Sequence, residues 1–204
     1  MITMFKLKRI LTNQKGVTLI ELISVMSISL MLILISAVGL SVFFSKYREL
    51  NTWVEMQRDA MNCLSTMKMG VPVGTQRETE YYGITNARKL RLIGALYGSG
   101  TGTGITCFPP ISDMSQAIDK SQFFFDGKAV RVNYVYRGVQ IGSPQYLFPS
   151  RDNLDIVELQ NFKITQENSG TEVMVVRVDL TARVKLGPKK YRIISFSTRM
   201  SRGL

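Results

Sequence analysis

Apolar residues form one long uninterrupted run near the beginning of the chain. Between Glu21 and Lys46 no residue is charged. As a helix with a rise of about 1.5 Å per residue, this run would be roughly 36 Å long, which exceeds the roughly 30 Å of a bilayer's hydrocarbon core. The pattern therefore predicts a membrane-spanning segment over about residues 22–45.

Beyond this run the apolar residues become periodic. They recur at spacings of three, four or seven with charged residues between them, which is typical of a helix that packs one face on a core. The positions are Tyr47, Leu50, Val54, Met61, Leu64 and Met67. No proline occurs before Pro72, and Gly70 is a suitable C-terminal stop. We expect one helix over residues 17–69, whose second half packs against a globular head formed by residues 70–204.

Alternation with a period of two marks the last third of the chain. In VVRVDLTARVKL every second residue from Val176 to Leu186 is apolar, and the residues between them are polar or charged. VRVNYVY predicts a strand with one apolar face, and LQNFKIT and YRIISFSTRM predict two more. The apolar face of VRVNYVY consists of Val130, Val132, Tyr134 and Tyr136. A long N-terminal helix followed by antiparallel strands predicts an α+β fold, with the sheet packed on the second half of the helix.

The stretch over residues 70–128 is weakly patterned. NARKLRLIGALYG is compatible with a strand or a short helix, and GSGTGTG predicts a flexible loop. This loop has neither the lysine of a phosphate-binding loop nor a G-x-G-x-x-G spacing, so we expect no nucleotide site there.

The composition excludes several classes of function. The chain has no histidine, which removes Ser–His–Asp and Cys–His catalysis and every histidine-based metal site. The two cysteines, Cys63 and Cys107, form no C-x-x-C motif. The net charge is +11, and four of the basic residues, Lys6, Lys8, Arg9 and Lys15, lie in an N-terminal segment without acids. We therefore expect neither catalysis nor a cofactor.

The acidic residue at the head of the apolar run leaves several interpretations open. A secretory signal peptide would be cut near residues 37–39, whereas a signal anchor would stay uncut with its basic end in the cytoplasm. Neither explains Glu21, because an acid within a membrane helix costs on the order of 2.5–3.5 kcal/mol. A third interpretation is that Glu21 marks the point at which the helix meets the lipid headgroups.

The motif KGVTLIEL resembles the processing site of type IV prepilins. The residues that match it are Gly16, Thr18, Leu19, Ile20, Glu21 and Leu22, whereas Val17 stands where phenylalanine is usual. In that family a prepilin peptidase cuts after the glycine and methylates the new N-terminal amine. The resemblance therefore implies a leader over residues 1–16, cleavage between Gly16 and Val17, and methylation of Val17.

The resemblance also implies an architecture and a role. Type IV pilins and pseudopilins have a long helix with a β-sheet head, and they pass from the bacterial inner membrane, head in the periplasm, into a filament. The implied partners are the prepilin peptidase, other pilin subunits, the inner-membrane assembly platform and, before assembly, membrane lipid. Thr18 and Glu21 would serve assembly, with Glu21 pairing with the amine of a neighbouring subunit. The head, with about 135 residues after Met69, is larger than that of a usual major subunit, which implies a minor subunit that initiates or caps the filament. The segments VELQNF, VVRVDLTARV and YRIISFSTRM resemble the larger J-type minor pilins.

The alternative from another class is a signal-anchored periplasmic binding module that never assembles. It predicts an intact N-terminus and indifference to the substitution Glu21→Ala. Under the pilin hypothesis, that substitution would leave processing largely intact and abolish incorporation into filaments.

Three further features each have two interpretations. In an oxidising periplasm Cys63 and Cys107 would form a disulfide, or they are two separately buried thiols. Asp152, Asp155 and Glu158, near Asn153, are oxygen donors suited to calcium, or they form an acidic turn. Between residues 183 and 202 all charged residues are basic, which favours DNA binding or a solvated strand face. These basic residues are Arg183, Lys185, Lys189, Lys190, Arg192, Arg199 and Arg202.

Overall fold

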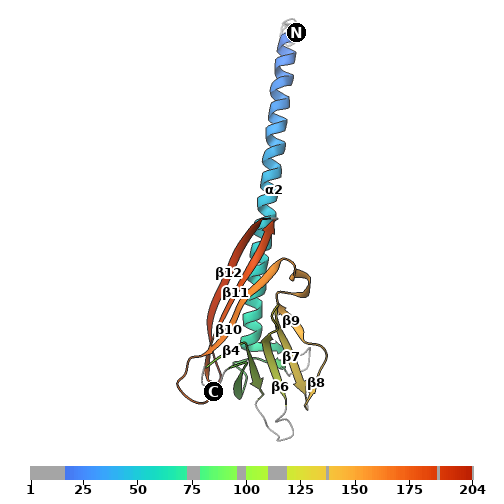
Figure 1. Cartoon of the computed structure of the whole chain (residues 1–204). Helices are drawn as coiled ribbons and strands as arrows, with labels where there is room; N and C mark the ends of the chain where they lie inside the picture. Colours follow the sequence, from blue (N-terminus) through green and yellow to red (C-terminus); the bar gives the residue numbers. More distant parts are fainter. Residues whose placement is uncertain are drawn as a thin grey trace, which may run out of the picture. The chain divides into compact units, whose positions relative to one another are not determined.

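A computed structural model gives the fold of the chain (Figure 1). It describes residues 17–72, 79–95, 100–109, 119–136, 138–187 and 189–203. The chain divides into two compact units, of which the first ends at Arg48 and the second begins at Glu49. Residues 1–16, which the resemblance predicts to be a leader cleaved after Gly16, lie outside the described residues.

The first described element is the long helix α2 (Leu19–Met69), as the sequence predicts. Gly70 follows with a φ of 82°, a left-handed conformation that commonly ends helices and that glycine adopts without strain. The backbone amides of Ile84 and Thr85 donate to the carbonyls of Met67 and Lys68. The last turn of α2 is therefore capped by a distant turn of the chain, which satisfies carbonyls that a helix end leaves without partners.

A four-stranded antiparallel sheet contains the strands that the sequence shows most clearly. Its order is β12 (Lys190–Ser201), β11 (Val175–Gly187), β10 (Val157–Gln166) and β4 (Thr101–Gly102). Along β11 the predicted apolar positions from Val176 to Val184 are all buried, which confirms the alternation. In β10 one extra residue between Leu159 and Asn161 shifts the register against β11, so Leu159 and Phe162 both face the core.

A second sheet forms largely from the stretch that was weakly patterned. Its strands are β3 (Lys89–Ile93), β5 (Gly104–Phe108), β6 (Lys120–Phe125), β7 (Val130–Tyr136) and β8 (Val139–Gln140), in that order, with β9 (Gln145–Phe148) also paired to β7. Two smaller features are the pair β1 (Gly70–Pro72) and β2 (Thr79–Tyr82), and the 3₁₀ turn η2 (Arg151–Asn153). The prediction for β7 is only partly right, because Asn133 and Val135 are buried as well as Val130 and Val132.

The glycine-rich segment around residue 102 is not simply a loop. β4 pairs with β10, whereas β5 pairs with β3 and β6, so the chain passes from one sheet to the other within a few residues. A Cβ atom on Gly102 would lie 2.4 Å from the carbonyl oxygen of Ile93, and one on Gly104 would lie 2.6 Å from that of Phe123. Glycine is required here because the neighbouring backbones leave no room for a side chain.

The core joins the second half of α2 to both sheets. The helix face that enters it contains Met56, Ala60, Cys63, Leu64 and Met67, with Trp53 partly buried. The prediction of this face is wrong in part. Leu50, Val54 and Met61 are each about half exposed, because the sheets cover the neighbouring face of the same helix. Tyr47, which belongs to the other unit, is also exposed. The fold class is nevertheless the predicted α+β arrangement of a long N-terminal helix and antiparallel sheets.

Candidate functional site

The start of α2 is held by a reciprocal set of hydrogen bonds between Thr18 and Glu21. The backbone amide and the hydroxyl of Thr18 each donate to Glu21 Oε2 at 2.9 Å. In return, the backbone amide of Glu21 donates to Thr18 Oγ1 at 3.3 Å. This is the capping box, in which a threonine at the helix start and a glutamate three residues later satisfy each other's free donors.

The capping box is a role for Glu21 that the sequence reasoning missed. The signal was available, because the spacing threonine-x-x-glutamate before an apolar run predicts this motif. The partial positive charge of a helix N-terminus also favours a carboxylate at this position. Two of the three bonds use Oε2 of the carboxylate, and none of them uses Oε1.

The helix that follows is long and apolar enough to cross a membrane, by its length and composition. None of the side chains in its most apolar window is buried against the rest of the chain. Between residues 22 and 44 the large apolar side chains are from 52% exposed at Leu22 to 69% exposed at Ile35. Such a surface is a candidate for contact with lipid or with other helices, since water would solvate it poorly.

Serine hydroxyls within this segment have partners in the helix itself. Ser24, Ser27 and Ser36 each donate to the carbonyl oxygen four residues earlier, at 2.7–2.8 Å. This removes the need for water at these positions, because an unsatisfied hydroxyl in hydrocarbon is costly. The serines are therefore compatible with an apolar environment.

Cys63 and Cys107 are two free, buried thiols, so the predicted disulfide is absent from the structure. Both lie in the common core, Cys63 on α2 and Cys107 on β5. Burial raises the pKa of the Cys63 thiol to about 12 and raises that of Cys107 as well. They behave as small apolar side chains, because desolvation disfavours the thiolate that reacts.

The calcium candidates do not form a site. Asp152 lies in η2, Asp155 lies in the turn after it and Glu158 lies on β10, and all three are exposed. Among the residues that the structure describes, no three acidic or cysteine side chains come together to hold a metal ion.

Most of the basic residues in the C-terminal run have partners within the chain. Arg199 pairs with Glu167 at 2.6 Å, and Arg202 lies 3.6 Å from Glu172. The guanidinium of Arg183 lies over the ring of Tyr191, 3.9 Å from its centroid. Lys190 forms an ion pair with Glu49. Pairing of Lys190, Arg199 and Arg202 with acids weakens the DNA interpretation for these three residues, because a cation paired with an acid attracts phosphate less strongly.

Comparison with known proteins does not assign the chain to a family. No protein-family model, curated protein or solved structure matches the chain. The long apolar helix with an antiparallel β-sheet head is compatible with a pilin-like fold.

Proposed function

We propose that the protein is a non-catalytic subunit of a type IV pilus, a type II secretion pseudopilus or a related filament. The observation that supports this most directly is the pair Thr18 and Glu21 at the start of an apolar helix with no cover from its own chain. The resemblance of KGVTLIEL to prepilin processing sites and the α+β architecture support the same proposal. A minor, J-type subunit fits the large head.

The assembly step follows from charge in an apolar environment. Cleavage between Gly16 and Val17 would create a cationic amine, which is costly in lipid unless it has a partner. Glu21 Oε1, outside the capping box, is the acceptor that we expect for the amine of a neighbouring subunit. Pairing offsets the cost of both charges and fixes the axial register, while the apolar helices provide the packing area.

The second half of the helix adds a further surface for assembly. Leu50, Val54 and Met61 recur at helical spacing and are 55%, 49% and 58% exposed. They lie beside the core-facing residues, on a face that the head's own sheets do not cover. A neighbouring helix would bury them, which favours a subunit of an assembly over an isolated module.

The first experiment is a measurement of the N-terminal mass of the full chain, purified from membranes with and without an active prepilin peptidase. We expect a peptide that begins at Val17 and carries one extra methyl group only when the peptidase is active. A chain that retains residues 1–16 would indicate a signal anchor, and one cut near Gly39 would indicate a secreted head. Either result would overturn the proposal.

Two variants separate the charge of Glu21 from its capping role. Glu21→Gln keeps a capping-box residue, since glutamine also serves at this position, but it removes the charge. Thr18→Ala keeps the charge and removes the hydroxyl of the cap. We expect Glu21→Gln to be processed and to fail to enter filaments, whereas Thr18→Ala enters them with reduced efficiency. Normal incorporation of Glu21→Gln would overturn the pairing of Glu21 with a neighbouring amine, whereas absence of the wild-type chain from filaments would favour the non-assembling binding module.

A further inference from the structure

Charge is distributed unevenly along the hairpin formed by β11 and β12. The end of the hairpin next to its turn contains five basic residues and no acid between positions 183 and 192. We call this set the basic hairpin end, and it consists of Arg183, Lys185, Lys189, Lys190 and Arg192.

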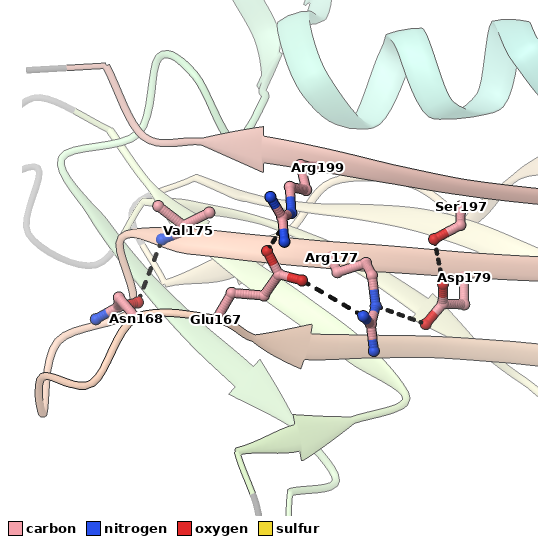
Figure 2. Close-up of polar contacts among 7 residues, drawn as sticks. All are labelled: Glu167, Asn168, Val175, Arg177, Asp179, Ser197 and Arg199. Carbon is pink, nitrogen blue, oxygen red and sulfur yellow. Dashed lines mark hydrogen bonds and ion pairs between the residues drawn. The ribbon is translucent and has the colours of Figure 1, made fainter.

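The opposite end of the hairpin is neutralised, as Figure 2 shows. Glu167 lies between two arginines, with Oε2 2.6 Å from Arg199 Nε and Oε1 3.5 Å from Arg177. Asp179 accepts from Arg177 at 3.3 Å and from the hydroxyl of Ser197 at 2.6 Å. Each arginine lies next to a carboxylate, so the positive charge at this end is largely balanced and attracts anions only weakly.

The basic hairpin end is engaged differently. Arg183 and Arg192 lie over the rings of Tyr191 and Trp53, at 3.9 and 5.2 Å from the ring centroids. A cation–π contact positions a guanidinium without cancelling its charge. Three acids lie close by: Glu49 pairs with Lys190, Glu158 is opposite Arg183 in the sheet register, and Asp155 precedes Ile156, whose carbonyl accepts from the amide of Lys185.

Lys185 and Lys189 are exposed. Five cations and three acids leave this end with a net positive charge, in contrast to the end drawn in Figure 2.

The position of Glu49 in the chain limits how far this end can lie from a membrane. Glu49 follows the last residue of the uncharged run, Ser45, by four residues. Four residues span at most about 14 Å even when fully extended, whatever the orientation of the two units. The ion pair between Glu49 and Lys190 holds the hairpin end next to Glu49, and so close to the end of the uncharged run. If residues 22–45 cross the bilayer, the hairpin end therefore lies within reach of the headgroups.

We propose that the basic hairpin end binds the headgroups of anionic phospholipids and so docks the head on the membrane before assembly. The proposal rests on the membrane-spanning role of the apolar helix and not on filament formation. Charge complementarity identifies the ligand, since juxtamembrane clusters of lysine and arginine attract anionic leaflets. Tyr191 and Ile193, 43% and 65% exposed on the same strand end, add the aromatic and apolar groups that favour a membrane interface.

The test uses the full chain in vesicles of phosphatidylcholine, with or without phosphatidylglycerol. Because both native cysteines are buried, a cysteine introduced as Ile193→Cys can be labelled selectively with a fluorophore. Ser201→Cys, about 26 Å farther along β12, is the distant control site. Quenching by a headgroup-labelled lipid then reports the fraction of heads that are docked. We expect stronger quenching at position 193 in anionic vesicles, and its loss at high salt.

The matched variants remove equal charge from different places. Lys185→Gln with Lys189→Gln should reduce the ratio of docked to undocked heads about 30-fold, because each cation near an anionic surface adds roughly a factor of five. Lys128→Gln with Lys163→Gln, both exposed and outside the basic hairpin end, should change it little.

Three outcomes would overturn the proposal. One is equal quenching in neutral and anionic vesicles, and another is equal effects of the two double variants. The third is that the protein in neutral vesicles binds duplex DNA and that this binding requires Lys185 and Lys189. This result would identify the surface as a nucleic-acid site. Alkaline extraction of the same vesicles separates a failure of the anchor from a failure of docking. The mass of the N-terminal peptide tests the pilin proposal independently of the docking experiment.

Discussion

Asp126 fixes the turn between β6 and β7 with a single carboxylate. Its Oδ1 accepts from the backbone amides of Lys128 and Ala129 at 2.9 and 2.8 Å, and its Oδ2 lies 2.6 Å from Arg131 Nε. The Arg131 guanidinium in turn lies over the ring of Tyr146 on β9, 4.1 Å from the centroid. Burial acts to raise the pKa of Asp126, but these backbone donors and Arg131 outweigh it and leave the pKa below its ordinary value.

We expect Asp126→Ala to lower the free energy of unfolding by about 1–3 kcal/mol at neutral pH, since it leaves backbone donors and an arginine without their acceptor. A lowered carboxyl pKa stabilises the fold above its unfolded value of about 3.9, and this contribution is lost as the pH falls through the folded value. The difference between wild type and variant should therefore shrink in acid. Urea unfolding in detergent, followed by the fluorescence of the single tryptophan, Trp53, measures both effects. A difference that persists unchanged in acid would contradict the account.

The two cysteines provide a second prediction for single residues. Because Cys63 and Cys107 are free and buried, the native protein should not react with a thiol reagent at mildly alkaline pH, and two thiols should react in denaturant. Thiol counting with and without urea, in the absence of reductant, makes the comparison. If the denatured protein from the periplasm shows no reactive thiol until a reductant is added, the two cysteines are paired in the cell.

At the scale of elements, β10 shows how one residue is accommodated in a regular ladder. Val157 and Leu159 pair with Val184 and Ala182, and after the bulge Phe162 and Ile164 pair with Leu180 and Val178. All of these side chains are buried. Gln160 is exposed and is the extra residue, so β10 without it would alternate regularly against β11.

This predicts that deletion of Gln160 is tolerated, with a change in the free energy of unfolding of less than about 2 kcal/mol. Deletion of Thr181 from β11 is the control, because the residues before it would turn to the opposite face and take Val176 and Val178 out of the core. We expect that variant not to fold. Circular dichroism and urea unfolding compare the stability of the two variants. Equal destabilisation by both deletions would show that the bulge is required.

At the scale of the whole molecule, the two compact units differ in the surroundings that they require. The unit that begins at Glu49 contains the core shared by helix and sheets. The other unit presents large apolar side chains that nothing else in the described chain covers. The unit that ends at Arg48 therefore requires an apolar environment, whereas the unit that begins at Glu49 has its own apolar core.

A charge in the middle of the apolar segment should therefore affect anchoring and leave the head unchanged. We expect Ile33→Arg to disfavour membrane insertion by about 2.5–3.5 kcal/mol. Alkaline extraction of membranes measures insertion, and Ile33→Leu is the matched control. Retention of the arginine variant in the membrane, at the level of the leucine variant, would contradict a spanning role for residues 22–45.

Much of the fold could be predicted from local pattern. The extent of α2, its stop at Gly70 and the buried positions of β11 all follow from periodicity and from the conformational freedom of glycine. The second sheet could not be predicted, because its strands are short and irregular and are defined by pairing with residues far along the chain. The same is true of the switch between sheets at Gly102 and Gly104, whose glycines suggested flexibility.

The sequence by itself determined the candidate site: the threonine-x-x-glutamate spacing, the apolar length after it and the basic run near the C-terminus are all local features. The tertiary structure alone decided which helix face is buried, that Cys63 and Cys107 are separate buried thiols, and which cations are neutralised. The physical reason is that each of these depends on contacts between residues distant in the chain. Glu167 neutralises Arg199, and Glu49 holds Lys190, only once the strands and the helix have packed together.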